Sequence, residues 1–233
     1  TFEELSELKF VVNEATYGIT LREAFEKARQ VLAPGYLTQY MACIAHGDAH
    51  NGNVWANTID DGYMLSWFDP AFAGEHIPVL LAEVKALFHN IFAHPDWLYD
   101  SRDADTSLQI IAEQKEGKLH VTHNWELSPL RQAFLESKRD NFWVPVLREL
   151  ASRDALPADW EVYVRAALFC CPTLVMNLRA GGGPSQNQHT PRTSLLGLSI
   201  ANMLISAPVE GQDVLSNFFN QLRESLIGCV HGN

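Results

Sequence analysis

Hydrophobic residues recur at helical spacing early in the chain. Between residues 20 and 32 the apolar positions are Leu21, Ala24, Phe25, Ala28, Val31 and Leu32. A repeat of three and four residues places such side chains on one face of a helix. Thr20 and Glu23 are spaced as a capping box, a pattern typical of helix starts. The sequence therefore predicts a helix over residues 20–32, which Pro34-Gly35 ends.

The same spacing returns after Pro78, which suits a first helical position. The apolar stripe there consists of Leu80, Val84, Leu87, Phe88, Ile91 and Phe92, and Pro95 closes it. Four further helices are expected, over residues 128–153 with a disturbance at Pro145, 158–179 with a kink at Pro172, 192–206, and 214–227 with Asp213 as N-cap. The polar, glycine-rich residues 181–192 are typical of a loop.

The middle of the chain has a different pattern. Two strand-like segments, residues 54–58 and 63–68, flank Asp60-Asp61-Gly62, a turn signal that favours a β-hairpin. The hairpin follows the polar run His46-Gly47-Asp48-Ala49-His50-Asn51-Gly52-Asn53. We therefore expect an α+β fold that is mostly α, with one small hairpin after a polar loop.

Charge and cysteine content narrow the function classes. The chain has 17 Lys and Arg against 28 Asp and Glu, a net charge of −11, so a generic nucleic-acid surface is not expected. The acidity is compatible with a cationic small-molecule substrate, although acidic soluble proteins are common. Cys43, Cys170, Cys171 and Cys229 form no CxxC spacing and no disulfide framework, which fits a reducing, cytoplasmic setting. No apolar run approaches the roughly 20 residues that a membrane span needs, so no membrane partner is expected.

The polar run and the end of the hairpin carry the candidate chemistry. Asp48 and Asn53 are five residues apart, the separation of the Asp and Asn in a kinase catalytic loop. Asp69 adds a third oxygen ligand after the second strand. Phosphoryl transfer needs a carboxylate that orients the attacking hydroxyl, and Mg²⁺, which prefers oxygen ligands. These three residues together indicate a metal-and-base site.

The run HGDAHNGN, followed by a hairpin and FDPAFAG, resembles the aminoglycoside phosphotransferase and choline kinase superfamily, which has a protein-kinase-like fold. The resemblance implies that Asp48 is the catalytic base, that Asn53 and Asp69 hold Mg²⁺, and that ATP is the phosphoryl donor. It implies that His46 braces the loop and that His50 either braces it or lies near a phosphate. The acceptor would be a hydroxyl of an aminoglycoside-, choline- or sugar-type molecule.

The match is close over residues 36–94, which would hold the catalytic loop, the hairpin, the metal aspartate and the following helix. Residues 95–233 would form a helical substrate-side region, so that residues 1–233 make one kinase-like C-terminal lobe. Only 47 residues precede Asp48, and Lys9 and Lys27 lie in helix-like surroundings. We therefore expect the N-terminal nucleotide-binding lobe to be absent from this chain, which begins with Thr as a fragment does. The chain alone would expose an apolar patch where that lobe docks and would show no kinase activity.

Two alternatives remain open at this point. His46, Asp48 and His50 alternate along the chain and offer ligands for a transition metal, as in a metal-dependent hydrolase. A non-catalytic binding module that keeps the kinase-like fold is the other alternative.

Overall fold

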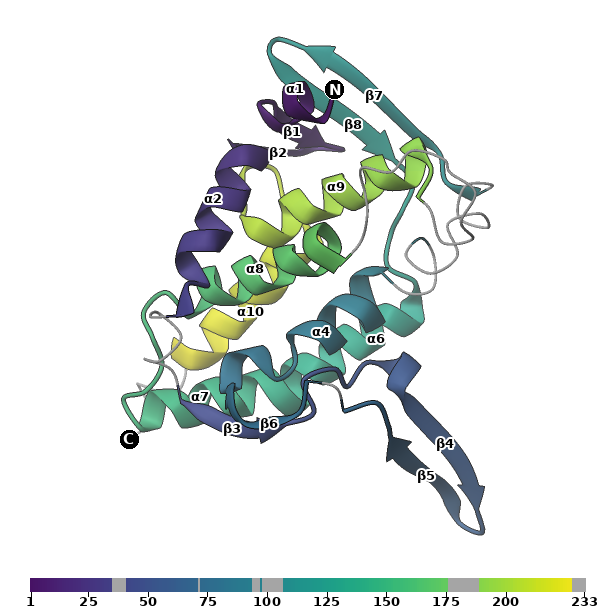
Figure 1. The fold of residues 1–233 in the computed structure, drawn as a ribbon, viewed down its shortest axis with the longest axis vertical. Helices are drawn as coiled ribbons and strands as arrows, with labels where there is room; N and C mark the ends of the chain where they lie inside the picture. The colour runs from purple at the N-terminus through teal and green to yellow at the C-terminus, as the bar shows by residue number, and fades with distance from the viewer. Residues whose placement is uncertain (35–40, 71, 94–96, 98–106, 176–188, 228–233) are drawn as a thin grey trace.

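The structure is a computed structural model of the chain and describes residues 1–34, 41–70, 72–93, 97, 107–175 and 189–227. It is a mixed α/β protein in which a helical body lies between a five-stranded sheet at one end and two small two-stranded sheets at the other (Figure 1). The expected mixture of helices and strands is therefore confirmed, but the sheets are more extensive than the one small hairpin expected.

The five-stranded sheet has the order β7-β8-β1-β2-β9. Its strands are β1 (Lys9–Val12), β2 (Ala15–Thr20), β7 (Ile110–Lys115), β8 (Lys118–His123) and β9 (Pro208–Glu210). β1 runs parallel to β8 and antiparallel to β2. Segments about 100 residues apart in the sequence thus meet in one sheet.

This sheet corrects two expectations from the sequence. Residues 95–233 are not uniformly helical, because β7, β8 and β9 lie within them. Lys9 is not in a helical segment, since it is the first residue of β1; Lys27 does lie in a helix. The strands of the sheet are short, and the parallel partner of β1 is the distant segment from Lys118 to Val121. The spacing of apolar residues within β1 could not predict this pairing.

The predicted helices are largely confirmed. The described helical elements are α1 (Phe2–Ser6), α2 (Leu21–Val31), α4 (Val84–Leu87), α6 (Pro129–Lys138), α7 (Val144–Ser152), α8 (Trp160–Cys170), α9 (Pro191–Ile205) and α10 (Val214–Ile227). The capping box of Thr20 and Glu23 is present, and Asp213 accepts the Ser216 N–H at 2.6 Å as an N-cap does. Pro95 and most of the predicted loop at 181–192 lie outside the described residues.

Three of the long predicted helices are interrupted by wider π-helical turns. These are η3 (Phe88–Ala93) after α4, η4 (Arg139–Trp143) between α6 and α7, and η5 (Cys171–Val175) after α8. Pro172 lies within η5, and Pro145 is the second residue of α7, directly after η4. A proline inside a helix removes a hydrogen bond and crowds the preceding turn. The helix expected from Pro78 begins later, since Pro78 ends strand β6 (Gly74–Pro78) and is followed by η2 (Val79–Leu81).

The core lies in the helical body and extends to the inner face of the five-stranded sheet. Its largest fully buried side chains include Tyr17, Phe88, Trp97, Trp143, Tyr163 and Phe169. The predicted stripe after Pro78 is buried, with every one of its six side chains at most 5% exposed. The polar loop at residues 46–53 is thus attached to the core through α4 and η3.

The two small sheets form the opposite end of the molecule. β3 (Ala42–Ala45) pairs with β6, and β4 (Val54–Ile59) pairs with β5 (Gly62–Trp67) as the predicted hairpin. Figure 1 shows the β4–β5 hairpin projecting away from the helices. No helix in the described part of the chain is long and apolar enough to cross a membrane.

Candidate functional site

The polar run predicted as a catalytic loop connects β3 to the hairpin. Gly47 has a φ of 79°, and a Cβ there would lie 2.5 Å from the carbonyl oxygen of Phe72. Only glycine combines this left-handed backbone with so close an approach. The loop is thereby held against the segment that follows Asp69.

His46 links the two halves of this arrangement. Its Nδ1 accepts the backbone N–H of Asp48 at 3.3 Å, and its Nε2 lies 3.0 Å from the carbonyl oxygen of Phe68. Because Nδ1 acts as an acceptor, Nε2 carries the proton and donates it to Phe68. Both ring nitrogens therefore bind backbone on either side of the loop, the geometry of a brace.

Asp48 and Asn53 are brought together within a single turn. The amide Nδ2 of Asn53 donates to the backbone oxygen of Asp48 at 3.0 Å and lies 3.4 Å from its carboxylate Oδ2. The Asp48 side chain is 13% exposed, and Asn53 is buried at 8% exposure. Since its nitrogen faces Asp48, the amide oxygen of Asn53 is turned away and stays available as a ligand.

His50 caps the short 3₁₀ turn η1 (Asn51–Asn53). Its Nδ1 accepts the Gly52 N–H at 3.1 Å, and its ring stacks on His89 with centroids 4.7 Å apart. Burial lowers the pKa of His50 from 6.5, and the Asp48 carboxylate only partly opposes this. Its Nε2 is 3.9 Å from Asp48 Oδ1. A neutral, capping imidazole thus lies beside the carboxylate.

Asp69 follows directly on the hairpin. The N–H of Phe68 donates to the carbonyl of Asn53 at 3.1 Å, which sets the chain next to the loop just before Asp69. Asp69 is exposed and has a φ of 54°, a left-handed conformation that is uncommon outside glycine. Such outliers persist where the surrounding structure imposes them, and they are concentrated at functional sites.

The donor set of Asn53 and Asp69 fits Mg²⁺ by its chemistry. Mg²⁺ is commonly held by one or two carboxylates, with waters and substrate phosphates completing the octahedron. Within the described ranges no three His, Cys, Asp or Glu side chains gather as a metal site. The amide and the single carboxylate would leave positions for the waters and phosphate oxygens that complete the octahedron.

Three side chains that the sequence interpretation missed come from α4 and η3. Lys85 Nζ lies 3.1 Å from Asp48 Oδ1, Asn90 Oδ1 accepts the Asn51 N–H at 2.9 Å, and His89 stacks on His50. They belong to a helix that was predicted from its apolar stripe alone. Its polar face carries the contacts that fix the loop.

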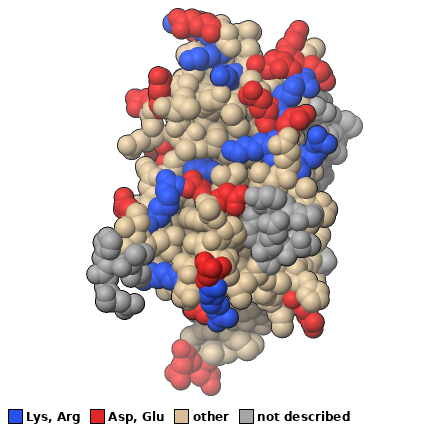
Figure 2. Space-filling view, turned by 90° about the vertical axis from the view of Figure 1, so that its left-hand side faces the viewer, with Lys and Arg blue, Asp and Glu red and all other residues tan. Residues whose placement is uncertain are grey.

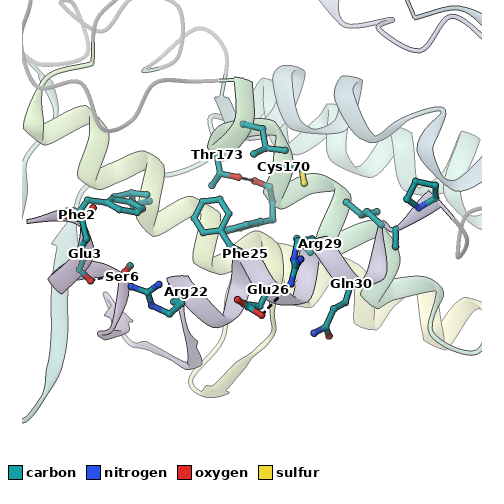
Figure 3. A pocket seen from close by; sticks show the side chains of 17 residues that line it. Phe2, Glu3, Ser6, Arg22, Phe25, Glu26, Arg29, Gln30, Cys170 and Thr173 are labelled. Atoms are coloured by element: carbon teal, nitrogen blue, oxygen red, sulfur yellow. Dashed lines mark hydrogen bonds and ion pairs between the residues drawn. The ribbon is translucent and has the colours of Figure 1, made fainter.

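A large cavity lies elsewhere in the molecule. It has a volume of about 1410 Å³ and an apolar floor that includes Phe25, Phe169 and Leu198, with residues of α1 and α2 at its rim (Figure 3). None of the loop residues lines it. Cys170 faces this cavity, while the pKa of the adjacent buried Cys171, raised to about 12 mainly by burial, responds to the charges of Lys85 and Asp48.

Charges on the α2 side of the molecule are mixed. Figure 2 shows acidic and basic side chains interspersed over this face, so the net charge of −11 does not appear there as one acidic field. Cys43, Cys170 and Cys171 are free thiols, and Cys229 lies outside the described residues.

Fold and site together define a mixed α/β protein with a braced polar loop in which a carboxylate and an amide meet. In comparisons with family models, curated proteins and solved structures, the chain has no significant match. The resemblance to the aminoglycoside phosphotransferase and choline kinase superfamily therefore stays a prediction from the motif residues.

Proposed function

We propose that this chain is the kinase-like C-terminal catalytic lobe of an ATP- and Mg²⁺-dependent phosphotransferase that acts on a hydroxyl of a small molecule. The observation that supports this best is the turn in which Asn53 donates to Asp48 while His46 braces the loop against Phe68. Residue types and spacing that suit phosphoryl transfer are thus arranged in one fixed loop.

In the proposed reaction Asp48 orients the acceptor hydroxyl and takes its proton. Asn53 and Asp69 would hold Mg²⁺, which neutralises charge on the phosphate oxygens. Catalysis of this kind depends on positioning and electrostatics, so a rigid loop is the main requirement of the protein. The contacts of His46 and His50 favour bracing roles for both.

The hydrolase alternative is less well supported. A metal held by His46, Asp48 and His50 needs an unprotonated ring nitrogen from each histidine. Both nitrogens of His46 are engaged with backbone groups, and Nδ1 of His50 accepts from Gly52. Binding a metal there would break the contacts that shape the loop.

The β4–β5 hairpin supports the proposal of a missing second lobe. We use the term hairpin surface for Trp55, Ile59, Tyr63, Met64, Leu65 and Trp67, which are 49–74% exposed. Strand alternation places Tyr63, Leu65 and Trp67 on one face and Trp55, Ile59 and Met64 on the other. A two-stranded hairpin is marginal by itself, and exposed apolar patches mark interaction sites. We propose that a nucleotide-binding lobe covers this surface.

Transfer of a labelled γ-phosphate from ATP tests the proposed function. The chain would be assayed alone and joined to any nucleotide-binding lobe encoded directly upstream, with aminoglycosides, choline and sugars as acceptors. The assays would use a reducing buffer, as suits a cytoplasmic protein. We expect a labelled acceptor only when the nucleotide-binding lobe is present. We also expect tight Mg²⁺-ATP binding only when that lobe is present. Absence of transfer in a two-lobed protein that binds ATP would favour the non-catalytic binding module.

A further inference from the structure

Lys85 is the one Lys or Arg within the stretch of sequence that carries the polar loop, the hairpin and Asp69. Between Arg29 and Arg102 the chain contains no other Lys or Arg, although this stretch includes the loop, the hairpin and Asp69. Residues 41–79 alone carry five acidic side chains, at positions 48, 60, 61, 69 and 75. A polyanion that approaches Asp48 is repelled by its carboxylate, and Lys85 is the only Lys or Arg of this stretch that can offset the repulsion.

The position of Lys85 is unusual for a merely neutralising partner. Its Nζ is 3.1 Å from Asp48 Oδ1, yet within the described residues that buried oxygen has no hydrogen-bond partner, since the ammonium approaches outside hydrogen-bonding geometry. On another side the ammonium lies over the Phe72 ring, 4.4 Å from its centroid, a contact that uses no acceptor. An ammonium has three N–H donors.

The surroundings leave this ammonium accessible. The Lys85 side chain is 27% exposed while that of Asp48 is 13% exposed, so the lysine is the more accessible of the two to solvent. Donors of Lys85 can therefore bind an anion that approaches Asp48 from solvent.

We propose that Lys85 is the phosphate-binding residue of this site and contacts a non-bridging oxygen of the terminal phosphoryl group of a polyphosphate. This rests on the proposed function. In the transfer step the acceptor oxygen bonds to the terminal phosphorus, the bond to the leaving ADP oxygen breaks with its electron pair, and the hydroxyl proton passes to Asp48. Lys85 keeps its proton and offsets the negative charge on the phosphoryl oxygens throughout.

A double-mutant cycle on polyphosphate binding tests this without requiring turnover. Tripolyphosphate would be titrated into the chain, followed by NMR of the lysine ammonium groups and of backbone amides. We expect Lys85→Gln to weaken binding by about tenfold, as loss of a charge-assisted hydrogen bond does, and Lys85→Arg to retain most of it. Lys115→Gln, at an exposed position on β7, is the matched control and should bind as the unmodified chain does.

Asp48→Asn provides the decisive corner of the cycle. If Lys85 binds phosphate, removing the carboxylate charge frees the ammonium and tightens tripolyphosphate binding several-fold, and adding Lys85→Gln abolishes this gain. If Lys85 only neutralises Asp48, Asp48→Asn and the double variant bind tripolyphosphate equally, which overturns the proposal. Because the double variant also removes the unpaired charge, it stays informative where Lys85→Gln alone fails to fold.

The phosphoryl-transfer assay separates failure of this proposal from failure of the proposed function. One outcome is that the Asp48 and Lys85 substitutions are coupled in tripolyphosphate binding, while a two-lobed protein transfers no phosphate. This outcome would support the anion site at Lys85 and contradict the proposed phosphotransferase activity. Conversely, transfer that is lost in Asp48→Asn but has an unchanged kcat in Lys85→Gln supports the phosphotransferase and removes Lys85 from its phosphate site.

Discussion

The helical body and the polar-loop region at residues 41–79 differ in the contacts that stabilise them. In the body, side chains as large as Trp143 and Phe169 are fully buried. Between residues 41 and 79, Asn53 is the only buried residue among those that the structure describes. The core of the body is apolar, whereas the loop region is fixed by a polar side chain, two histidines and contacts from one helix. The apolar core that stabilises the fold thus lies in the helical body. The candidate site lies in a region that depends on contacts from a neighbouring helix.

The largest expected effect concerns the candidate base. In a two-lobed form of the protein, Asp48→Asn should lower phosphoryl-transfer turnover by about 10² to 10⁴, the range for a positioned general base. Thermal unfolding should change little, because Asp48 belongs to the region without a core. A variant with near-normal turnover would remove Asp48 from the role of base.

A matched pair of tryptophans measures the contrast in stability directly. Trp143→Ala in the body should lower the free energy of unfolding by about 3–5 kcal/mol, since it empties a fully buried site. Trp67→Ala, at 54% exposure on the hairpin surface, should change it by about 0.5 kcal/mol or less. Denaturant unfolding of both variants is the measurement. Equal losses would mean that the hairpin is packed in solution.

A side chain at position 47 should strain the polar loop. Gly47→Ala should destabilise the loop by about 1–3 kcal/mol, because its φ of 79° is unfavourable for a side chain and the Cβ would meet Phe72. Gly62→Ala is the control: its φ is 143°, but no atom lies within 4 Å of the added Cβ. Hydrogen exchange of the amides of residues 46–53 should accelerate in Gly47→Ala and not in Gly62→Ala. Similar exchange in both variants would argue against the contact with Phe72.

A smaller effect is expected from pH. Burial lowers the pKa values of His50, His123 and His189 from 6.5. The folded chain then binds fewer protons than the unfolded chain, so stability is full above pH 6.5 and falls as the pH drops below it, by at most about 1.4 kcal/mol per unit for each histidine. Urea unfolding at pH 7.5 and 5.5 measures this, and His189→Gln should reduce the slope. Stability that rises on acidification would contradict these directions.

The sequence predicted what is local and missed what is distant. The hairpin, the capping box at Thr20 and the cap at Asp213 follow from residues within a few positions of one another, and all three are present. The turn that joins Asp48 to Asn53 was accessible for the same reason. The five-stranded sheet was not, because β1 is four residues long and its parallel partner lies more than 100 residues away.

Lys85 illustrates the same limit within the site. It is 37 residues from Asp48 and lies on a helix that was predicted from its apolar stripe alone. A signal was nevertheless available, since Lys85 is the only Lys or Arg between Arg29 and Arg102. A lone cation in a long acidic stretch next to a candidate base is a feature that sequence reasoning can use.

The proposed metal site consists of Asn53 and Asp69, which would hold a divalent cation beside Asp48. It is tested most directly by paramagnetic broadening of backbone amide resonances when Mn²⁺ is added to the chain in place of Mg²⁺. We predict broadening at residues 48–53 and 67–70 that is lost in Asp69→Ala, weakened in Asn53→Ala and unchanged in Asp61→Asn at the hairpin tip. Asp69→Ala should have the larger effect because it removes a full charge. Broadening that is centred elsewhere, or that survives both substitutions, would contradict the account.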